Sequence, residues 1–220
     1  YAKIEGWSVG VIVNQRKVVK SKTGEMQFGG VIYGDAADKA TRFIANCNQR
    51  NIPLVFLQDV TGFMVGSNAE HGGIIKDGAK MVNAVANSIV PKFTIIVGNS
   101  FGAGNYAMCG KAYDPRFMLA WPTAKLAVMG GSQAANVLLQ IEKVTAKKSG
   151  TSLNAKKEKE LKESIQSNYN EKTEILHAAS QLWVDAVIKP EETRSWISMG
   201  IDIANQAPSE EKFNMGLLQV

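Results

Sequence analysis

Two short, almost entirely apolar runs constrain most strongly what this chain can fold into. Leu54-Val55-Phe56-Leu57 is apolar throughout, and Phe93-Thr94-Ile95-Ile96-Val97 contains a single threonine. Strands that are covered on both faces have this pattern, which is typical of a parallel sheet. A helical pattern follows each run, and this alternation of strand and helix predicts an α/β domain with right-handed crossovers. The helix after the first run should bury one apolar face, formed by Ile75, Ala79, Val82, Ala86 and Ile89.

Further elements continue this alternation along the chain. Short apolar runs predict strands at 9–13, 29–33, 117–120 and 126–129. With Asp35 as its N-cap, a helix should run to about Asn51 and carry at helical spacing Ala36, Ala40, Phe43, Ile44 and Cys47. Residues 130–132 should open another helix, whose apolar side is Ala134, Ala135, Leu138 and Ile141. The last elements expected are a helix over 171–179, a strand or turn at 183–188 and a closing helix over 193–204.

Residues 143–170 differ in composition from the rest of the chain. They are rich in Lys, Glu, Ser and Asn, and Glu158 and Lys162 stand four residues apart. This spacing favours a helix with a solvated face, and the alternative is that the lysines form a binding patch. The sequence shows no internal repeat and no clear linker. We therefore expect a single domain with a helical excursion.

Composition and charge narrow the classes of function. The 220 residues contain 2 cysteines and 2 histidines, which are too few for a disulfide scaffold or a metal site built from Cys and His. The net charge of +5 suits an anionic ligand such as a phosphate-bearing cofactor. Aromatic residues are not interleaved with the lysines, so nucleic acid is not expected as a partner. No apolar run approaches the ~20 residues that span a bilayer, so no membrane is expected either.

The segment from Gly98 to Gly110 is the most informative part of the sequence. Gly98, Gly102 and Gly104 follow an expected buried strand and precede an expected short helix. Glycine lets a ligand approach the backbone closely. Free N–H groups at a helix start can hold an anion or a developing oxyanion. A tight strand-to-helix turn with close packing is the structural alternative, and the residues alone leave both open.

The same segment matches the pattern of a serine nucleophile. Gly98-Asn99-Ser100-Phe101-Gly102 has the G-x-S-x-G spacing of a nucleophile elbow. An α/β hydrolase needs an acid and a later histidine as well, and the only downstream histidine, His177, falls within an expected helix rather than a loop. A hydrolase that uses Ser100 is therefore kept only as an alternative.

Other candidate residues surround these segments. Asp59 ends an expected strand and either projects into a ligand site at the sheet edge or caps the following loop, which is the interpretation we favour. Phe63 and Met64 form either an apolar wall for a ligand or a simple anchor. Cys47 should be buried and inert. Cys109 lies close to a helix start that could lower the pKa of its thiol.

Several long motifs, in order along nearly the whole chain, resemble the carboxyltransferase subunits of biotin-dependent acyl-CoA carboxylases. The forms T-G-F-M-V-G, F-G-A-G-N-Y and M-G-G-x-Q-A-A-N look most like the methylcrotonoyl-CoA carboxylase β subunit. The motifs are Asp59–Gly66, Lys76–Val82, Ser100–Tyr106, Trp121-Pro122 and Val128–Ala135.

The resemblance implies a crotonase-like (ClpP-like) fold, a β-β-α superhelix, and a subunit with two such halves. Residues 1–220 match the C-terminal half, and the N-terminus Tyr1-Ala2-Lys3-Ile4-Glu5 reads as mid-protein sequence. We therefore expect a fragment of a longer subunit, an acyl-CoA carboxyltransferase C-terminal domain. In this family the N-terminal half mainly carries coenzyme A and the C-terminal half mainly receives carboxybiotin. The active site forms where the N half of one subunit meets the C half of another, which implies a homo-oligomer.

The resemblance also assigns residue roles. Carboxyl transfer runs from carboxybiotin to the α or vinylogous γ carbon of an acyl-CoA thioester, with methylcrotonoyl-CoA as the leading substrate. The amides of Ala103 and Gly104 would form the oxyanion hole for the biotin ureido oxygen. The residues expected to line the biotin approach are Gly62, Phe63, Phe101 and Gly102. The residues expected on the substrate side are Tyr106, Gly130 and Gly131.

Partners and location follow from the same resemblance. Biotin would arrive covalently attached to a biotin carboxyl carrier domain, and a biotin carboxylase subunit would load it. The location would be cytoplasmic in a bacterium and the mitochondrial matrix in a eukaryote.

The sequence departs from the family pattern at two places, Ser132, where many relatives have Glu, and the divergent stretch 143–163. These departures put the acyl specificity in doubt more than the fold. Without an N half the chain should transfer no carboxyl group, and the alternatives are a decarboxylase of the same family and a non-catalytic assembly module.

Overall fold

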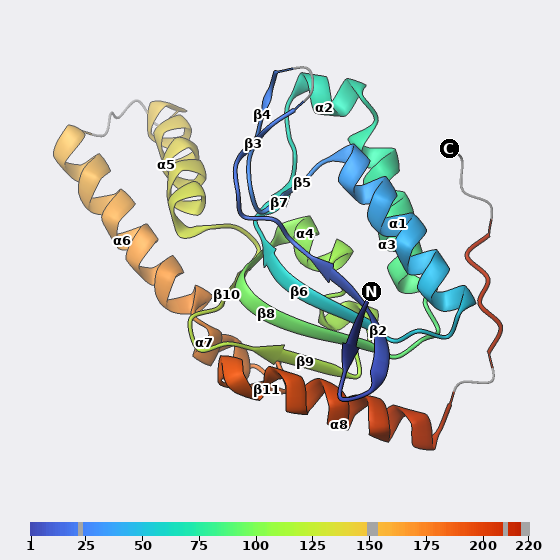
Figure 1. The fold of residues 1–220 in the computed structure, drawn as a ribbon. Coiled ribbons are helices and arrows are strands. Elements are labelled where there is room, and N and C mark those ends of the chain that lie inside the picture. The colour runs from blue at the N-terminus through green and yellow to red at the C-terminus, as the bar shows by residue number, and fades with distance from the viewer. Residues whose placement is uncertain (22–23, 149–153, 209–210, 217–220) are drawn as a thin grey trace.

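A central, mostly parallel sheet forms the body of the molecule (Figure 1). The computed structural model describes residues 1–21, 24–148, 154–208 and 211–216. The sheet has the order β1-β2-β6-β8-β9-β11, and β10 also pairs with β8. Its strands are β1 (Ala2–Ile4), β2 (Trp7–Val13), β6 (Leu54–Val60), β8 (Lys92–Phe101), β9 (Phe117–Ala120), β10 (Lys125–Ala127) and β11 (Ala186–Val187). All pairings are parallel except that of β1 with β2.

Both faces of this sheet are covered, as the apolar runs predict. Helices α1 (Gly34–Gln49) and α3 (Ile74–Ala86) pack on one face, where Leu54, Phe56 and Val60 of β6 join their core. Helix α8 (Thr193–Gln206) packs on the other face with Val55, and Gly200 lets its backbone approach the ring of Phe93. Alternate residues of β6 therefore enter different cores, as the period of a strand requires.

Smaller elements surround the sheet at the ends of its strands. The pairs β3 (Val19–Lys20) with β4 (Met26–Gln27) and β5 (Val31–Ile32) with β7 (Gly62–Phe63) form two-stranded ribbons. The short helices are α2 (Ser67–His71), α4 (Gly102–Ala107) and α7 (Ile175–Ser180), with single 3₁₀ turns at Lys111–Tyr113 and Pro190–Glu192. Helix α7 packs on the sheet through Ile175 and Ala178.

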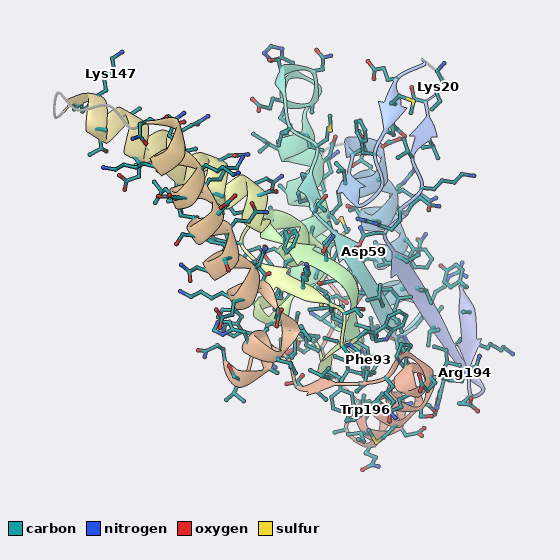
Figure 2. The ribbon with its side chains drawn as sticks, turned by 90° about the vertical axis from the view of Figure 1, so that its left-hand side faces the viewer. Lys20, Asp59, Phe93, Lys147, Arg194 and Trp196 are labelled. Carbon is teal, nitrogen blue, oxygen red and sulfur yellow. The ribbon has the colours of Figure 1, made fainter. Side chains whose placement is uncertain are left out.

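Helices α5 (Gly131–Lys148) and α6 (Ala155–Thr173) pack side by side and project from the sheet (Figure 1). Figure 2 shows Lys147 at the outer end of this pair, far from Phe93 in the core. An ion pair of 2.8 Å joins Lys143 to Glu158. Helices α5 and α6 together form the expected helical excursion. Residues 149–153 of the charged stretch lie outside the described residues. Within the described part of the chain, no helix is long and apolar enough to cross a membrane.

Several local expectations were wrong. The buried face of α3 is Ile74, Gly78, Met81, Ala84 and Val85, while Ile75 is 75% exposed. The face is rotated by one residue because Gly78 leaves room for the ring of Phe63. On α5, Leu138 and Ile141 are exposed, and only the small residues near its start are buried.

Three element boundaries also differ. The N-cap of α1 is Tyr33, and Asp35 lies inside the first turn, where its Oδ1 accepts from the Ala36 amide at 2.8 Å. The helix expected over 171–179 breaks at Glu174, which is extended and pairs with Lys125. Strand β8 continues through Phe101 instead of turning at Gly98, because β10 pairs with its last residues.

Candidate functional site

The carboxyl ends of β6 and β8 lie side by side and lead directly into the candidate site. Val60 near the end of β6 pairs with Ser100 near the end of β8. Strand β6 is followed by β7, and β8 is followed by α4. In parallel α/β sheets, ligands bind outside this edge. The conspicuous glycine motifs of the sequence therefore meet at the edge where binding sites form.

Helix α4 begins abruptly at a left-handed glycine. Gly102 has φ +53°, and a Cβ there would lie 3.1 Å from the carbonyl oxygen of Val128. The N–H groups in the first turn of a helix have no carbonyl partner within the helix. Phe101, at the N-cap, provides no side-chain cap. Within residues 1–21, 24–148, 154–208 and 211–216, no carbonyl outside α4 accepts a hydrogen bond from the amides of Ala103 or Gly104.

The same helix approaches the sheet edge closely. A Cβ on Gly104 would lie 2.5 Å from Val60 Cγ2 and 3.2 Å from the Cα of Gly62. Ala103 is exposed and Gly104 is buried. The two interpretations of this segment therefore apply together, since the glycine provides the close packing and the first-turn amides remain uncapped. Such a turn can hold an anion or a developing oxyanion.

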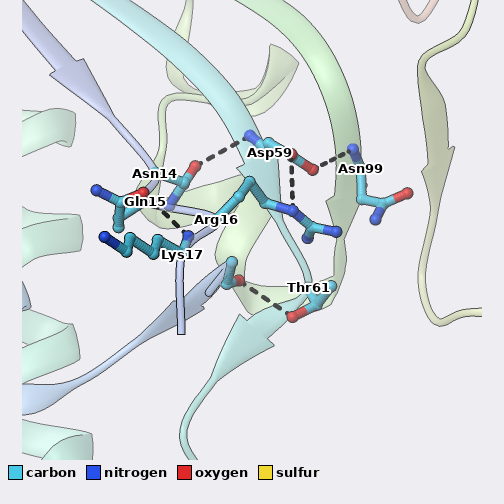
Figure 3. Close-up of polar contacts among 8 residues, drawn as sticks. Asn14, Gln15, Arg16, Lys17, Asp59, Thr61 and Asn99 are labelled. Atoms are coloured by element: carbon cyan, nitrogen blue, oxygen red, sulfur yellow. Dashed lines mark hydrogen bonds and ion pairs between the residues drawn. The ribbon is translucent and has the colours of Figure 1, made fainter. Parts of the chain in front are cut away.

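Asp59 joins the loops around this edge (Figure 3). Its Oδ1 accepts from the Asn99 amide at 2.9 Å, and its Oδ2 lies 3.1 Å from Arg16 Nε. Its own amide donates to Asn14 Oδ1 at 3.1 Å. Gly98 permits this, because a Cβ there would lie 2.4 Å from Asp59 Oδ1. Asp59 thus links β6 to β8 and to the segment after β2, so the interpretation that it caps the loop that follows it was wrong. The roles of Asn14 and Arg16 were missed, although both follow an expected strand.

Ser100 is not a nucleophile in this structure. Its side chain is fully buried; the hydroxyl donates to Gln58 Oε1 at 2.5 Å and accepts from Asn105 Nδ2 at 2.7 Å. His177 lies on α7, where its ring packs edge-on against Trp183 with 6.1 Å between centroids. A nucleophilic serine needs access and a hydrogen-bonded base, so the hydrolase alternative is wrong. The G-x-S-x-G pattern thus marks a turn from a strand to a helix, and it does not mark a nucleophile.

The remaining candidate residues divide into two groups. Gly62 has φ +146° and open space where a Cβ would stand, and the ring of Phe101 lies against Gly130. Tyr106 is 50% exposed, with its ring edge-on to that of Tyr113. Together with α4 these residues form the accessible part of the edge.

Two candidates serve packing instead. The ring of Phe63 lies against Gly78 of α3, where an added Cβ would be 3.0 Å from the ring. This contact anchors the β7 loop, so anchoring is the better description of Phe63. Gly131 is buried under the Asn170 side chain of α6, which a Cβ would meet at 2.4 Å. Gly78 and Gly131 are therefore both needed for close contact between elements.

The two cysteines are buried. Burial raises the pKa of the Cys109 thiol to about 11, and burial also raises the pKa of the Cys47 thiol. The expectation that a helix start could lower the pKa of Cys109 was wrong, because this residue follows the C-terminal end of α4. Among the residues that the structure describes, no group of three His, Cys, Asp or Glu side chains could hold a metal ion.

The fold is an α/β architecture with a parallel sheet, and the carboxyl edge of that sheet carries an uncapped, glycine-rich helix start of the kind that can accept an anion. Comparison with known proteins identifies the family within this class. The family model of the carboxyl transferase domain matches residues 1–215. The chain therefore belongs to the carboxyl transferase family.

The similar proteins include curated and solved members of this family. The chain is 44% identical over 208 residues to the mitochondrial methylcrotonoyl-CoA carboxylase β chain of Dictyostelium discoideum, covering 94% of this chain and 33% of the relative. The geranyl-CoA carboxylase β subunit of P. aeruginosa superposes with a TM-score of 0.79 at 37% identity, over 98% of this chain and 38% of that one. The transcarboxylase 12S structure, described as a hexamer assembly, gives 0.78 at 32% identity, over 98% of this chain and 39% of that one.

These neighbours confirm the expected crotonase-like fold and the resemblance read from the motifs. The chain spans about a third of the length of the curated relatives it matches. What such relatives do as whole proteins therefore comes to this chain only as a proposal.

Alkylation tests the environment of Cys109 beside α4. A thiol whose pKa is about 11 holds roughly a hundredfold less thiolate at pH 8 than one with a pKa of 9. We expect iodoacetamide to leave Cys109 and Cys47 unmodified in the native protein at pH 8 and to modify both in denaturant. Peptide mass spectrometry measures each site. Rapid native alkylation of Cys109 would contradict its burial.

Proposed function

We propose that this chain is the biotin-binding, C-terminal half of an acyl-CoA carboxyltransferase subunit. The observation that carries the proposal is the uncapped first turn of α4, which leaves the amides of Ala103 and Gly104 free at the carboxyl edge of the sheet. This turn lies in a chain that belongs to the carboxyl transferase family. The donors are backbone groups, so no side-chain acid or base is required at this position.

The residues present fit the ureido group of biotin. Carboxybiotin supplies the carboxyl group to be transferred. The amides of Ala103 and Gly104 would hold the ureido oxygen, where negative charge develops as the carboxyl group leaves. Gly62, which has open space where a Cβ would stand, would leave the approach unobstructed. Phe101, Gly102 and the anchored Phe63 would line it. The oxyanion donors would be fixed before the reaction, so they would need no rearrangement during it.

The acyl group would lie on the neighbouring part of the edge. Tyr106 and Gly130 would border the acyl-CoA thioester, while Gly131, buried under Asn170, would hold the start of α5 beside them. The exposed ring of Tyr106 would shape the space beside α4. Methylcrotonoyl-CoA is the substrate we favour, because the Dictyostelium relative at 44% identity is named a methylcrotonoyl-CoA carboxylase β chain. Transfer would then reach the vinylogous γ carbon, and for saturated thioesters the α carbon.

The partners follow from the same assignment. A biotin carboxyl carrier domain would present biotin to the edge, a biotin carboxylase subunit would load it, and coenzyme A would enter as part of the substrate. A second copy of the subunit would complete the site through its N-terminal half, as part of a homo-oligomer. The location would be the mitochondrial matrix in a eukaryote and the cytoplasm in a bacterium. The name of the Dictyostelium relative describes that protein as mitochondrial.

A carboxylation assay tests the function directly. The complete subunit, purified with its biotin-carrying partner, should incorporate labelled bicarbonate into methylcrotonoyl-CoA in the presence of ATP, and residues 1–220 alone should not. Geranyl-CoA, propionyl-CoA and acetyl-CoA serve as competing substrates. Preference for another thioester would change the substrate, and net decarboxylation of a carboxylated thioester would indicate the reverse direction. Failure with every thioester in both directions would contradict the proposal and favour an assembly module.

A paired substitution tests the role of α4. Gly104→Ala places a Cβ against Val60 and should push the first-turn amides away from the sheet edge. We expect kcat to fall about 10- to 100-fold, part of the loss that removal of an oxyanion donor causes. Val60→Ala removes the clashing methyl groups, so Gly104→Ala with Val60→Ala should recover most of the activity. Val60→Ala alone is the matched control, and an unchanged kcat in Gly104→Ala would count against the assignment.

A further inference from the structure

A chain of three polar side chains lies beneath the first turn of α4. Gln58 of β6 and Ser100 of β8 are fully buried, and Asn105 of α4 is partly buried. Asn105 Nδ2 donates to Ser100 Oγ at 2.7 Å, and the Ser100 hydroxyl donates to Gln58 Oε1 at 2.5 Å. Gln58 Nε2 donates in turn to the carbonyl oxygen of Met108 at 2.7 Å. The chain therefore begins at Asn105 of α4, passes through both neighbouring strands and ends at Met108, the residue that follows α4.

Each hydrogen bond among these three side chains has one possible donor and one possible acceptor. The serine hydroxyl has one proton, and since it gives that proton to Gln58, its oxygen is free to accept from Asn105. Among the described residues, no buried side-chain nitrogen or oxygen lacks a partner. Gly110 makes room for the Asn105 amide oxygen, which a Cβ at that position would meet. The three side chains thus form one satisfied network that specifies a single arrangement.

The six residues of α4 bring little apolar side-chain surface of their own to the core. The buried residues of this six-residue helix are Gly104 and Ala107, which bring almost no side-chain surface to the core. A helix of this length is also far too short to be stable by itself. Met108, buried just beyond the last residue of α4, anchors that end of the helix by apolar packing. The network adds directional contacts to the sheet at Asn105, in the middle of the helix, and at the carbonyl group of Met108.

We propose that Gln58, Ser100 and Asn105 are positioning residues that hold the amides of Ala103 and Gly104 in place for the reaction. This inference rests on the proposed function. None of the three side chains needs to touch biotin or the thioester, since they act through the backbone of α4. The match of Ser100 to a nucleophile pattern thus has a different explanation, because a buried hydroxyl at this position links the two strands to the helix.

Truncation of the network provides the test, in the complete subunit with its biotin-carrying partner. Ser100→Ala leaves the Asn105 amide and the Gln58 carbonyl without their partner, and Asn105→Ala removes the first donor. We expect each variant to lower kcat about tenfold or more, with the KM for the acyl-CoA thioester within about twofold of the unmodified enzyme. The double variant should lose little more than the worse single variant, because residues that act as a unit are not additive.

Ser88→Ala is the matched control. Ser88 is also buried, and its hydroxyl donates to an amide oxygen, that of Asn48, at 3.1 Å in a region between α1 and the turn after α3. It should lower the melting temperature about as much as Ser100→Ala while leaving kcat within about twofold. If the Ser100 variant does not fold, Asn105→Ala carries the test, because that side chain is only partly buried.

The outcomes separate this inference from the proposed function. An unmodified subunit that transfers no carboxyl group refutes the function itself. An active subunit whose Ser100 and Asn105 variants keep the kcat of Ser88→Ala, or change only KM, refutes the positioning role and leaves the function standing.

Discussion

The contact between α4 and the end of β6 exists because residue 104 has no side chain. With a Cβ 2.5 Å from Val60, the helix could not occupy its present position, and the backbone of β7 would no longer adjoin it. The left-handed Gly102 turns the chain sharply enough to start the helix directly at the sheet edge. Two glycines thus determine where the first-turn amides lie, and the proposed chemistry depends on those amides.

An uncapped helix start has an energetic cost, since unsatisfied N–H groups favour water or a ligand over an empty apolar surface. Ala103 remains exposed, so solvent can satisfy its amide until a ligand replaces it. The buried network of Gln58, Ser100 and Asn105 stabilises the helix from below without occupying those amides. In this arrangement, side chains provide rigidity and the backbone provides chemistry, which explains why no catalytic side chain stands out at the candidate site.

The sheet could be predicted from the sequence because the runs at 54–57 and 93–97 place apolar residues on both faces of a strand, with Thr94 as the exception. The glycine segment was located for a similar reason, since few other patterns demand close backbone approach. Details that depend on tertiary partners could not be predicted. The face of α3 rotates to admit Phe63, the end of β8 is extended by β10, and Cys109 is buried at the wrong end of α4 for activation. The role of Gln58 was also missed, because a single glutamine in an apolar strand gives no periodic signal.

The central claim concerns two backbone amides, so NMR of the backbone observes it most directly. We predict that titration of ¹⁵N-labelled protein with biotin shifts the amide resonances of Ala103 and Gly104 first and most, with smaller shifts at Gly62 and Phe101. The resonance of Ala79 on the exposed face of α3 should stay unchanged. Saturable shifts that cluster elsewhere, with Ala103 and Gly104 unaffected, would contradict the account.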